Sequence, residues 1–333
     1  MTRIDRAGIA LAIGSVAWTV AAARSDPGSR PVPAVLLVAG CVAAVTTGRI
    51  VRRHLDRTTL PVALAGLGGC LAGLAIRFRP FDPNGGPLGD ANANGAAFGL
   101  VALAAVLLAA CVPHHGRRSR QAAAAVVGAA LALVVLTGSA AALAATLAGL
   151  VLAGSAGRGR VRWAAAPAAL VVVSLALGVT AALGAGAGPR TTGADSLGTR
   201  IGFWREAVQV ARDEPLTGIG PGRLTEATSP AGETGPRRAR SLPLRVAAEQ
   251  GAPGLALLLA LGGWTAVALW SNAADPAAAV GTGVLLVIGL LGCWDWVLAD
   301  PGVTLPAATL VGVATHRRRR TAREVLDSLL RPR

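Results

Sequence analysis

The sequence contains no lysine and no tyrosine, and its 333 residues include only four cysteines. No two cysteines form a CxxC pair, so the pattern typical of a zinc or thiol–disulfide site is missing. All four fall inside or at the edge of long apolar runs, where we interpret them as small core residues. We therefore expect no metal and no cofactor. The cysteines are Cys41, Cys70, Cys111 and Cys293.

Negative charge is also scarce, because 17 acidic residues face 32 arginines and leave a formal net charge of +15. This balance invites a nucleic-acid function. The arginines, however, fall mostly in short loops and in the C-terminal tail, as expected of the flanks of membrane helices. With 53% hydrophobic residues and a mean hydropathy of +0.56, the sequence is too apolar for a soluble domain. We expect the lipid bilayer as its partner, and no nucleic acid.

Repeated apolar runs long enough to cross about 30 Å of hydrocarbon predict an all-α polytopic membrane bundle of about ten transmembrane helices, with one large outer-face loop. On the third run, Gly66, Gly69 and Gly73 share one face, which is typical of close helix packing. The predicted regions are N-terminal transmembrane helices (1–187), an extracytoplasmic loop with amphipathic helices (188–251), C-terminal transmembrane helices (252–315) and a basic tail (316–333). The predicted spans cover residues 7–23, 32–48, 60–76, 91–112, 121–137, 139–154, 163–187, 252–270, 277–298 and 302–315.

The distribution of arginines sets the orientation of these spans. With the N-terminus inside, the inner segments hold 19 arginines and the short outer loops hold four. The loop 188–251 holds the remaining nine, but long segments cross a membrane largely regardless of their charge. We expect a multi-pass protein of the cytoplasmic membrane with both termini in the cytoplasm. His54, His114, His115 and His316 then lie on the inner side, so none serves a site on the outer face.

Residues 199–212 form the pattern of one amphipathic helix in the outer loop. Trp204 and Val208 recur at helical spacing on its apolar face, and Arg205 and Arg212 share another face. This pattern fits a helix at the membrane interface with solvated arginines. It also fits a cationic surface for a lipid diphosphate, because arginine binds phosphate oxygens through two parallel hydrogen bonds.

A turn follows this helix at residues 215–222, where a proline ends the helix and three glycines permit a tight bend. Backbone amides in such turns can surround an anion. As a phosphate-binding motif the segment is weak, because no strand precedes it and no GK[ST] follows it.

Four arginines lie close to the point where the chain returns to the membrane. They fit either a solvated loop or an anion site. Glu249, just before the next span, is costly at that depth unless it is solvated or paired. We expect one of the arginines to pair with it. They are Arg237, Arg238, Arg240 and Arg245.

Polar residues also mark the outer ends of three other spans. Asn92 and Asn94 are candidates for capping the helix that begins near residue 91. Asp295 and Asp300 lie at the last outer loop, where carboxylates can bind sugar hydroxyls or act as a base. Asp300, which precedes a proline, is equally suited to cap a helix.

One pattern of spaced residues runs through the stretch from Thr199 to Leu261: an arginine, a tryptophan, a proline followed by alternating glycines, and a glutamate followed by two more glycines. Its members are Arg200, Trp204, Pro215, Leu216, Gly218, Ile219, Gly220, Gly222, Ser241, Leu244, Glu249, Gly251 and Gly254. This pattern resembles the signature region of the O-antigen ligase and polymerase superfamily, which are bacterial membrane glycosyltransferases. Segments 89–95 and 136–140 resemble two further motifs of that family.

The resemblance implies an all-helical membrane bundle whose large outer loop covers the site. It also implies transfer of a glycan from a polyprenyl-diphosphate carrier to an acceptor hydroxyl. In the family, arginines hold the leaving diphosphate, and a histidine of the loop is proposed to activate the acceptor. Here the histidine position is Arg240, which cannot act as a base at physiological pH. The arginine of the 136–140 motif is replaced by Ala140.

Candidate roles follow from the resemblance and from the residues themselves. Glu249 and Asp300 are the candidates for a replacement base. The alternative is a non-catalytic relative that binds a lipid-linked glycan or a partner in cell-envelope polysaccharide assembly. The candidates for binding the diphosphate or the rest of the substrate are Arg200, Arg205, Arg237, Arg240, Arg245, Asn92 and Asn94.

Overall fold

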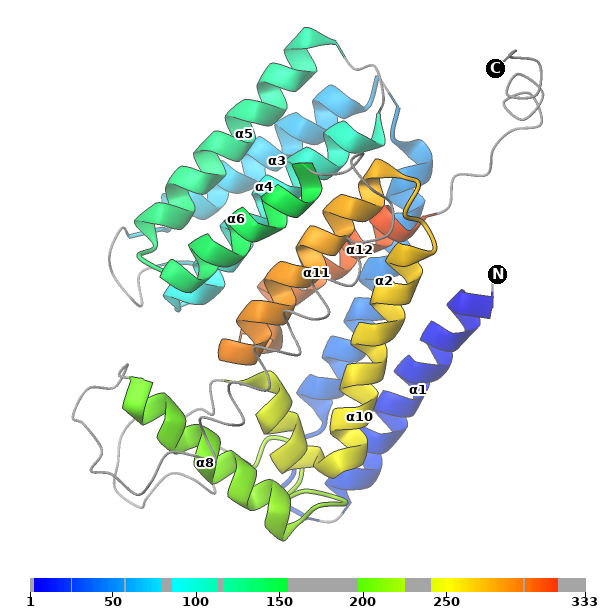
Figure 1. Cartoon of the computed structure of the whole chain (residues 1–333), viewed down its shortest axis with the longest axis vertical. Coiled ribbons are helices and arrows are strands. Elements are labelled where there is room, and N and C mark those ends of the chain that lie inside the picture. The colour runs from blue at the N-terminus through cyan, green and yellow to red at the C-terminus, as the bar shows by residue number, and fades with distance from the viewer. Residues whose placement is uncertain are drawn as a thin grey trace.

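The structure, a computed structural model, describes residues 3–24, 26–56, 58–79, 86–112, 116–154, 197–224, 241–295 and 297–316. These ranges hold ten α-helices, one short 3-10 helix and no strand (Figure 1). The helices are α1 (Arg3–Ala23), α2 (Val32–His54), α3 (Leu60–Ile76), α4 (Ala91–Cys111), α5 (Arg117–Leu136), α6 (Ala140–Gly154), α8 (Leu197–Asp213), α10 (Leu242–Trp270), α11 (Pro276–Trp294), η1 (Val297–Ala299) and α12 (Pro301–Thr315).

The prediction of a polytopic helical bundle is confirmed. Nine of the ten predicted spans coincide with helices, and the remaining one, 163–187, lies outside the described residues. Six helices are long and apolar enough to cross a membrane by length and composition, and α3, α6 and α12 are shorter apolar helices. The amphipathic helix expected at 199–212 is α8, which lies across one end of the bundle (Figure 1).

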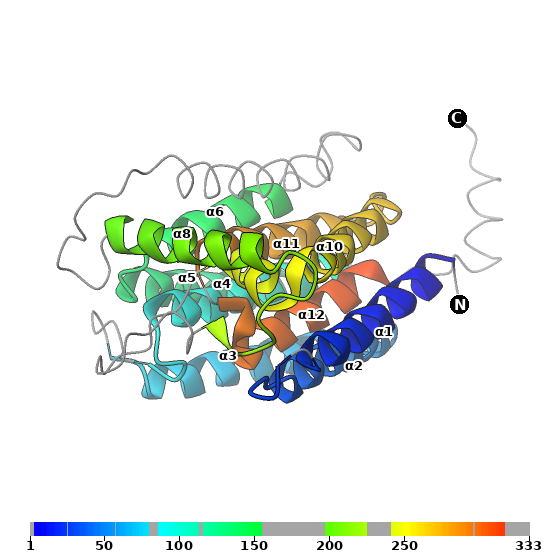
Figure 2. The same ribbon diagram turned by 90° about the horizontal axis from the view of Figure 1, so that it is seen from below.

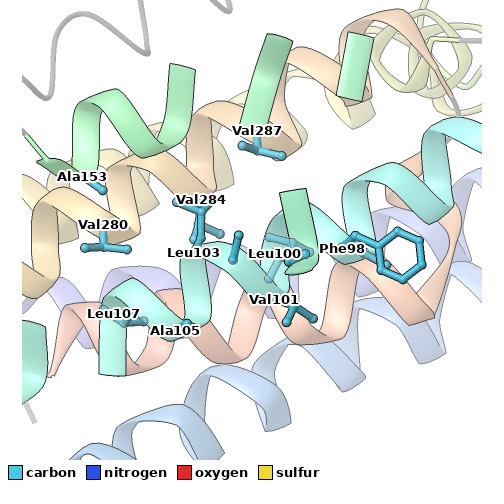
Figure 3. Packing of buried hydrophobic residues seen from close by; sticks show 14 of the residues in the cluster. Phe98, Leu100, Val101, Leu103, Ala105, Leu107, Ala153, Val280, Val284 and Val287 are labelled. Carbon is cyan, nitrogen blue, oxygen red and sulfur yellow. The ribbon is translucent and has the colours of Figure 1, made fainter. Parts of the chain in front are cut away.

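The core of the bundle lies around α4 and α11. Helix α4 is rich in alanine, glycine and leucine on all its faces, and α3, α5, α6, α11 and α12 surround it. Figure 3 shows Leu103 and Leu107 of α4 beside Val280 and Val284 of α11, with Ala153 of α6 adjacent. A helix that is apolar all round buries every face, so α4 takes the central position.

Backbone contacts between helices depend on glycines at two crossings. On α11, a Cβ at Gly283 would lie 2.5 Å from the carbonyl oxygen of Gly149 on α6. Where α2 crosses α12, a Cβ at Gly48 would overlap the carbonyl oxygen of Thr309, and one at Gly312 would overlap that of Val45. Small residues allow this approach, which is the main source of packing energy between apolar helices in lipid.

The glycine face predicted on the third span belongs to α3, and it does not pack against another described helix. None of the described residues lies within 4 Å of a Cβ built at Gly66, Gly69 or Gly73. Within the described residues, this glycine face of α3 makes no close helix contact and is exposed. The buried face of α3 carries Leu64 and Leu71 instead.

Helix starts follow capping chemistry. Asp90, Asp275 and Asp300 precede α4, α11 and α12, and the carboxylate of each accepts a hydrogen bond from an amide of the first turn. Asp90 accepts from the amides of Asn92 and Ala93 at 2.8 and 3.0 Å. Asp90 is thus the cap of α4, and the expectation that Asn92 or Asn94 has that role is corrected.

Different segments of the chain meet at the two ends of the bundle. At one end, Arg52 pairs with Asp275 at 3.1 Å and Arg49 pairs with Asp5 at 2.9 Å. At the opposite end, which we call the α8 end, the loop between α1 and α2 meets the segment after α8. The loops that the arginine distribution assigned to the outer side, at 24–31, 137–139 and 295–300, all lie at the α8 end.

Replacing Gly283 by alanine should destabilise the bundle, because the added Cβ meets backbone of α6 that no side-chain rotation can move. We expect a cost of about 1–3 kcal/mol, which is typical of overpacking. The measurement is the midpoint of thermal unfolding of the detergent-solubilised protein. Gly128→Ala on α5, where nothing lies within 4 Å, is the matched control. Equal midpoints for the two variants would contradict the assignment of the α6–α11 crossing.

Candidate functional site

Helix α10 is broken near its start, and this break organises the α8 end. Gly251 has φ 67° and ψ −171°, a backbone conformation that is essentially restricted to glycine. Two residues later Pro253 has no amide hydrogen to donate. The carbonyl groups of the preceding turn therefore lose helical partners, and in a buried position they need replacements.

The turn at 215–222 supplies most of these partners. The amides of Ile219 and Gly220 donate to the carbonyl oxygens of Ala248 and Glu249, each at 3.0 Å. In return, the amide of Ala252 donates to the carbonyl oxygen of Pro215 at 2.8 Å. We call this contact between residues 215–222 and 248–252 the turn–kink junction.

The glycines of the junction are required by the distance between the two backbones. A Cβ at Gly218 would lie 2.5 Å from the carbonyl oxygen of Ala248, and a Cβ at Gly251 would overlap the carbonyl oxygen of Leu216. Gly218, Gly220 and Gly222 also have positive φ angles of 64°, 94° and 83°. The glycine pattern that was recognised in the sequence is thus the pattern of one backbone–backbone contact.

This contact decides between the two interpretations of the turn. The amides of Ile219 and Gly220 point to carbonyl oxygens of α10. They are therefore not directed at a bound phosphate. The anion that the turn does hold belongs to the protein, because the Glu249 carboxylate accepts hydrogen bonds from the backbone of Gly222 and Leu224.

Glu249 is buried and paired, as the sequence predicted. Its Oε1 lies 2.7 Å from Nε of Arg245, one helical turn earlier on α10, and 3.4 Å from the amide of Leu224. The side chains of Glu249 and Arg245 are 7% and 14% exposed. A buried ion pair is costly to break from one side, because the remaining charge loses its partner. Through these contacts, the side chain of Glu249 also bonds to the turn that packs against α10.

The loop between α1 and α2 holds the junction from the other side. The amide of Arg30 donates to the carbonyl oxygen of Pro221 at 2.8 Å, and Arg223 pairs with Asp26 at 3.0 Å. On α1, Nε1 of Trp18 donates to the carbonyl oxygen of Gln250 at 2.8 Å. No sequence signal linked Trp18 to Gln250, since 232 residues separate them.

Helix α8 packs on this junction through its apolar face, over the start of α10 (Figure 2). Trp204 and Ala207 are buried against Leu244 and Ala248 of α10. The indole of Trp204 also meets that of Trp294, at the end of α11, with ring centroids 5.4 Å apart in an edge-to-face arrangement. No sequence pattern linked Trp294 to α8, because 90 residues separate it from Trp204.

The structure describes the side chains of two of the three arginines on α8. Arg205 is half-buried, whereas Arg212 is exposed near the end of the helix. Arg200 lies in the first turn of α8, and its side chain is outside the description. Arg237 and Arg240 fall in residues 225–240, which the structure does not describe.

A second group of polar residues lies at the α8 end, and we call it the Asn92 cluster: Asn92, Ser139 and Asp295. Nδ2 of Asn92 donates to Oδ2 of Asp295, and the Ser139 hydroxyl donates to Oδ1 of Asn92. Ser139 and Asp295 are buried. The cluster joins the start of α4, the turn between α5 and α6, and the end of α11. Three segments that lie far apart in the sequence therefore meet at one point.

The other two candidates at helix starts are engaged locally. Asn94 is buried, donates to the carbonyl oxygen of Asp90 at 2.7 Å and accepts from the amide of Leu88 at 3.2 Å. Asp300 accepts from the amide of Gly302 at 2.7 Å as the cap of α12. The structure does not bring Asn94 or Asp300 into contact with the Asn92 cluster through any hydrogen bond in the described part of the chain.

The fold and the arrangement of its polar groups define a polytopic helical membrane protein with a polar site at one end of the bundle. Residues 123–259 match the family model described as O-Antigen ligase, which agrees with the resemblance noted in the sequence. The matched region contains α8, the turn–kink junction and the α5–α6 turn with Ser139. No curated protein matches the chain.

Gly251→Ala should dismantle the turn–kink junction. The backbone conformation at Gly251 costs about 1–3 kcal/mol for a residue with a Cβ, and the overlap with Leu216 adds about 1–3 kcal/mol. We expect a lower unfolding midpoint and faster proteolysis of the segment between α8 and α10. Gly262→Ala, on the same helix with nothing within 4 Å, should change neither. Unchanged proteolysis in Gly251→Ala would show that the junction does not hold this segment.

Proposed function

We propose that this protein transfers a glycan from a polyprenyl-diphosphate carrier to an acceptor hydroxyl, at the outer face of the cytoplasmic membrane. The observation that supports this most is the meeting of the family signature with the Asn92 cluster. The Trp204–Trp294 contact joins α8, which carries Arg200 and Arg205, to the residue next to Asp295. A single end of the bundle thus offers arginines, an amide, a hydroxyl and carboxylates.

The reaction explains the need for these groups. The bond from the sugar to the diphosphate breaks with its electrons on the diphosphate, so positive charge near that group stabilises the transition state. Arginine supplies this charge with two parallel donors. We assign this role first to Arg200, which occupies the arginine position of the family signature, and then to Arg205, Arg237, Arg240 and Arg245.

The orientation of the protein belongs to the same proposal. Arginines are concentrated in the segments at the end that contains Arg49 and Arg52, and this favours a cytoplasmic position for this end and for both chain termini. The α8 end then faces the outside, where the lipid-linked glycan is presented. The lipid tail of the carrier remains in the bilayer beside the apolar helices.

The transfer reaction is the test of this function. The full chain is reconstituted in liposomes with a polyprenyl-diphosphate oligosaccharide and a panel of glycolipid acceptors, and release of free polyprenyl diphosphate is followed. Arg200→Ala and Arg205→Ala should each lower kcat by about 10²–10³, the size typical of removing one transition-state donor. Arg77→Ala, an exposed arginine at the end of α3, is the control. Equal loss in all three variants would point to unfolding or general charge effects.

Glu249 has two candidate roles that one isosteric substitution separates. If Glu249 is the base, Glu249→Gln abolishes transfer and leaves the unfolding midpoint unchanged. If its role is to hold Arg245 and the turn, the substitution lowers the midpoint, because Arg245 then lies buried beside a neutral partner, at a cost of about 3–5 kcal/mol when a buried pair is broken. Its three contacts favour the second outcome. Full activity together with full stability would exclude both roles.

The alternative is a relative that binds a lipid-linked glycan without transferring it. Two departures from the family pattern favour it, namely arginine at the histidine position, Arg240, and Ala140 in place of an arginine. Saturable binding of the polyprenyl-diphosphate oligosaccharide, with no release of the carrier for any acceptor, is the expected result for this alternative.

A further inference from the structure

The end of the bundle opposite α8, which we call the arginine end, carries more positive charge than its carboxylates balance. The last two turns of α2 contribute Arg49, Arg52 and Arg53. Arg52 pairs with Asp275 at 3.1 Å and Arg49 pairs with Asp5 at 2.9 Å. Arg53 is exposed and makes no ion pair in the described part of the chain. One guanidinium group is therefore left uncompensated at an accessible position.

The neighbouring segments do not remove this excess of charge. Asp56, three residues after Arg53, is held by hydrogen bonds from the two threonines of its own turn. The pair between Asp5 and Arg49 brings the start of α1 to the end of α2. This contact adds a second exposed arginine, Arg6, which makes no ion pair among the described residues.

The arginines of α2 also act on His316, the residue that follows α12. Burial lowers the pKa of His316, and the guanidinium groups of Arg53, Arg52 and Arg49 lower it further. Asp275 is the one carboxylate that raises this pKa. The imidazole is thus neutral at pH 7, and three positive charges of α2 lie around the end of α12. The local potential there favours an anion.

Two ordinary effects account for arginines at this end, but not for their gathering. The negative end of the α2 dipole favours cations, and loops on the cytoplasmic side of a membrane protein are rich in arginine. Neither effect requires Arg49 and Arg53 to lie four residues apart on one face of α2, where like charges repel each other. An anion bound between the two guanidinium groups would remove that repulsion.

Exposed apolar side chains lie directly beside these arginines. Ile50 follows Arg49 on α2, and Ile9 lies one turn after Arg6 on α1. The last residue of α10, Trp270, is also exposed, and tryptophans at helix ends are typical of the headgroup level of a bilayer. The surface therefore fits a ligand that has an anionic group and apolar chains together.

We propose that the arginine end binds the phosphate of an anionic phospholipid headgroup, with Arg53 and Arg49 of α2 as the main donors and Arg6 of α1 beside them. Arginine suits this ligand because its planar guanidinium group offers two parallel donors to phosphate oxygens. The acyl chains of the lipid lie along the apolar faces of α1 and α2, next to Ile9 and Ile50.

Lipid binding by the full chain in a neutral detergent tests this inference. The protein is titrated with phosphatidylglycerol or with phosphatidylcholine of the same acyl chains, and bound lipid is counted by native mass spectrometry. We expect phosphatidylglycerol to bind more tightly and to raise the midpoint of thermal unfolding. Arg53→Gln should weaken phosphatidylglycerol binding about fivefold, the size expected for one arginine near an anionic lipid surface. Arg118→Gln, an exposed arginine at the start of α5, is the matched control for net charge.

A charge reversal at the same position sharpens the test. Arg53→Glu changes the local charge by two units, so its affinity for phosphatidylglycerol should fall about thirtyfold. Because the side chain of Arg53 is exposed, both variants should fold with the midpoint of the unaltered protein when no lipid is added.

Three results would overturn the inference. The first is equal affinity of the unaltered protein for phosphatidylglycerol and phosphatidylcholine. The second is an equal affinity for phosphatidylglycerol in Arg53→Gln and Arg118→Gln. The third is an inorganic phosphate titration that raises the unfolding midpoint as much as the lipid does, which would identify a site for free anions. None of these measurements depends on glycan transfer, so lipid binding and the proposed function are tested independently.

Discussion

The α8 end depends on the break in α10 at Gly251. Within an apolar bundle a helix cannot be interrupted without replacing the hydrogen bonds that it loses, because no water is available to take them. Here the replacements come from the glycine-rich turn after α8 and from Trp18 of α1. At this break, α10, the turn after α8 and α1 are therefore bonded to one another. Their contact determines where the chain leaves the bundle.

The remaining features of the α8 end follow from this contact. Once the turn at 215–222 lies against α10, the short connection before it places α8 over the start of α10, where Trp204 reaches Trp294. Glu249 and Arg245 add a buried ion pair to the same contact. The glycines of this pattern thus shape the backbone that presents α8, and the Glu249 side chain is held against the same turn.

The polar groups at this end have two different physical roles. Those that satisfy backbone or cap helices, such as Asp90, Asn94 and Asp300, lower the energy of the fold. Asn92 and Asp295 instead bond to each other across helices, so they connect the start of α4 to the end of α11.

The sequence by itself determined the helical class, the positions of nine described spans, the amphipathic α8 and the pairing of Glu249 with an arginine. These features are local, because apolar run length, helical periodicity and the cost of a buried charge act within a few residues. Tertiary structure decided what the glycines contact, since the partners of Gly218 and Gly251 lie about thirty residues away along the chain. It also assigned the cap of α4 to Asp90, turned the glycine face of α3 outward, and brought Asn92, Ser139 and Asp295 together. No periodicity or composition encodes such meetings, because they depend on how helices that are distant in sequence cross in space.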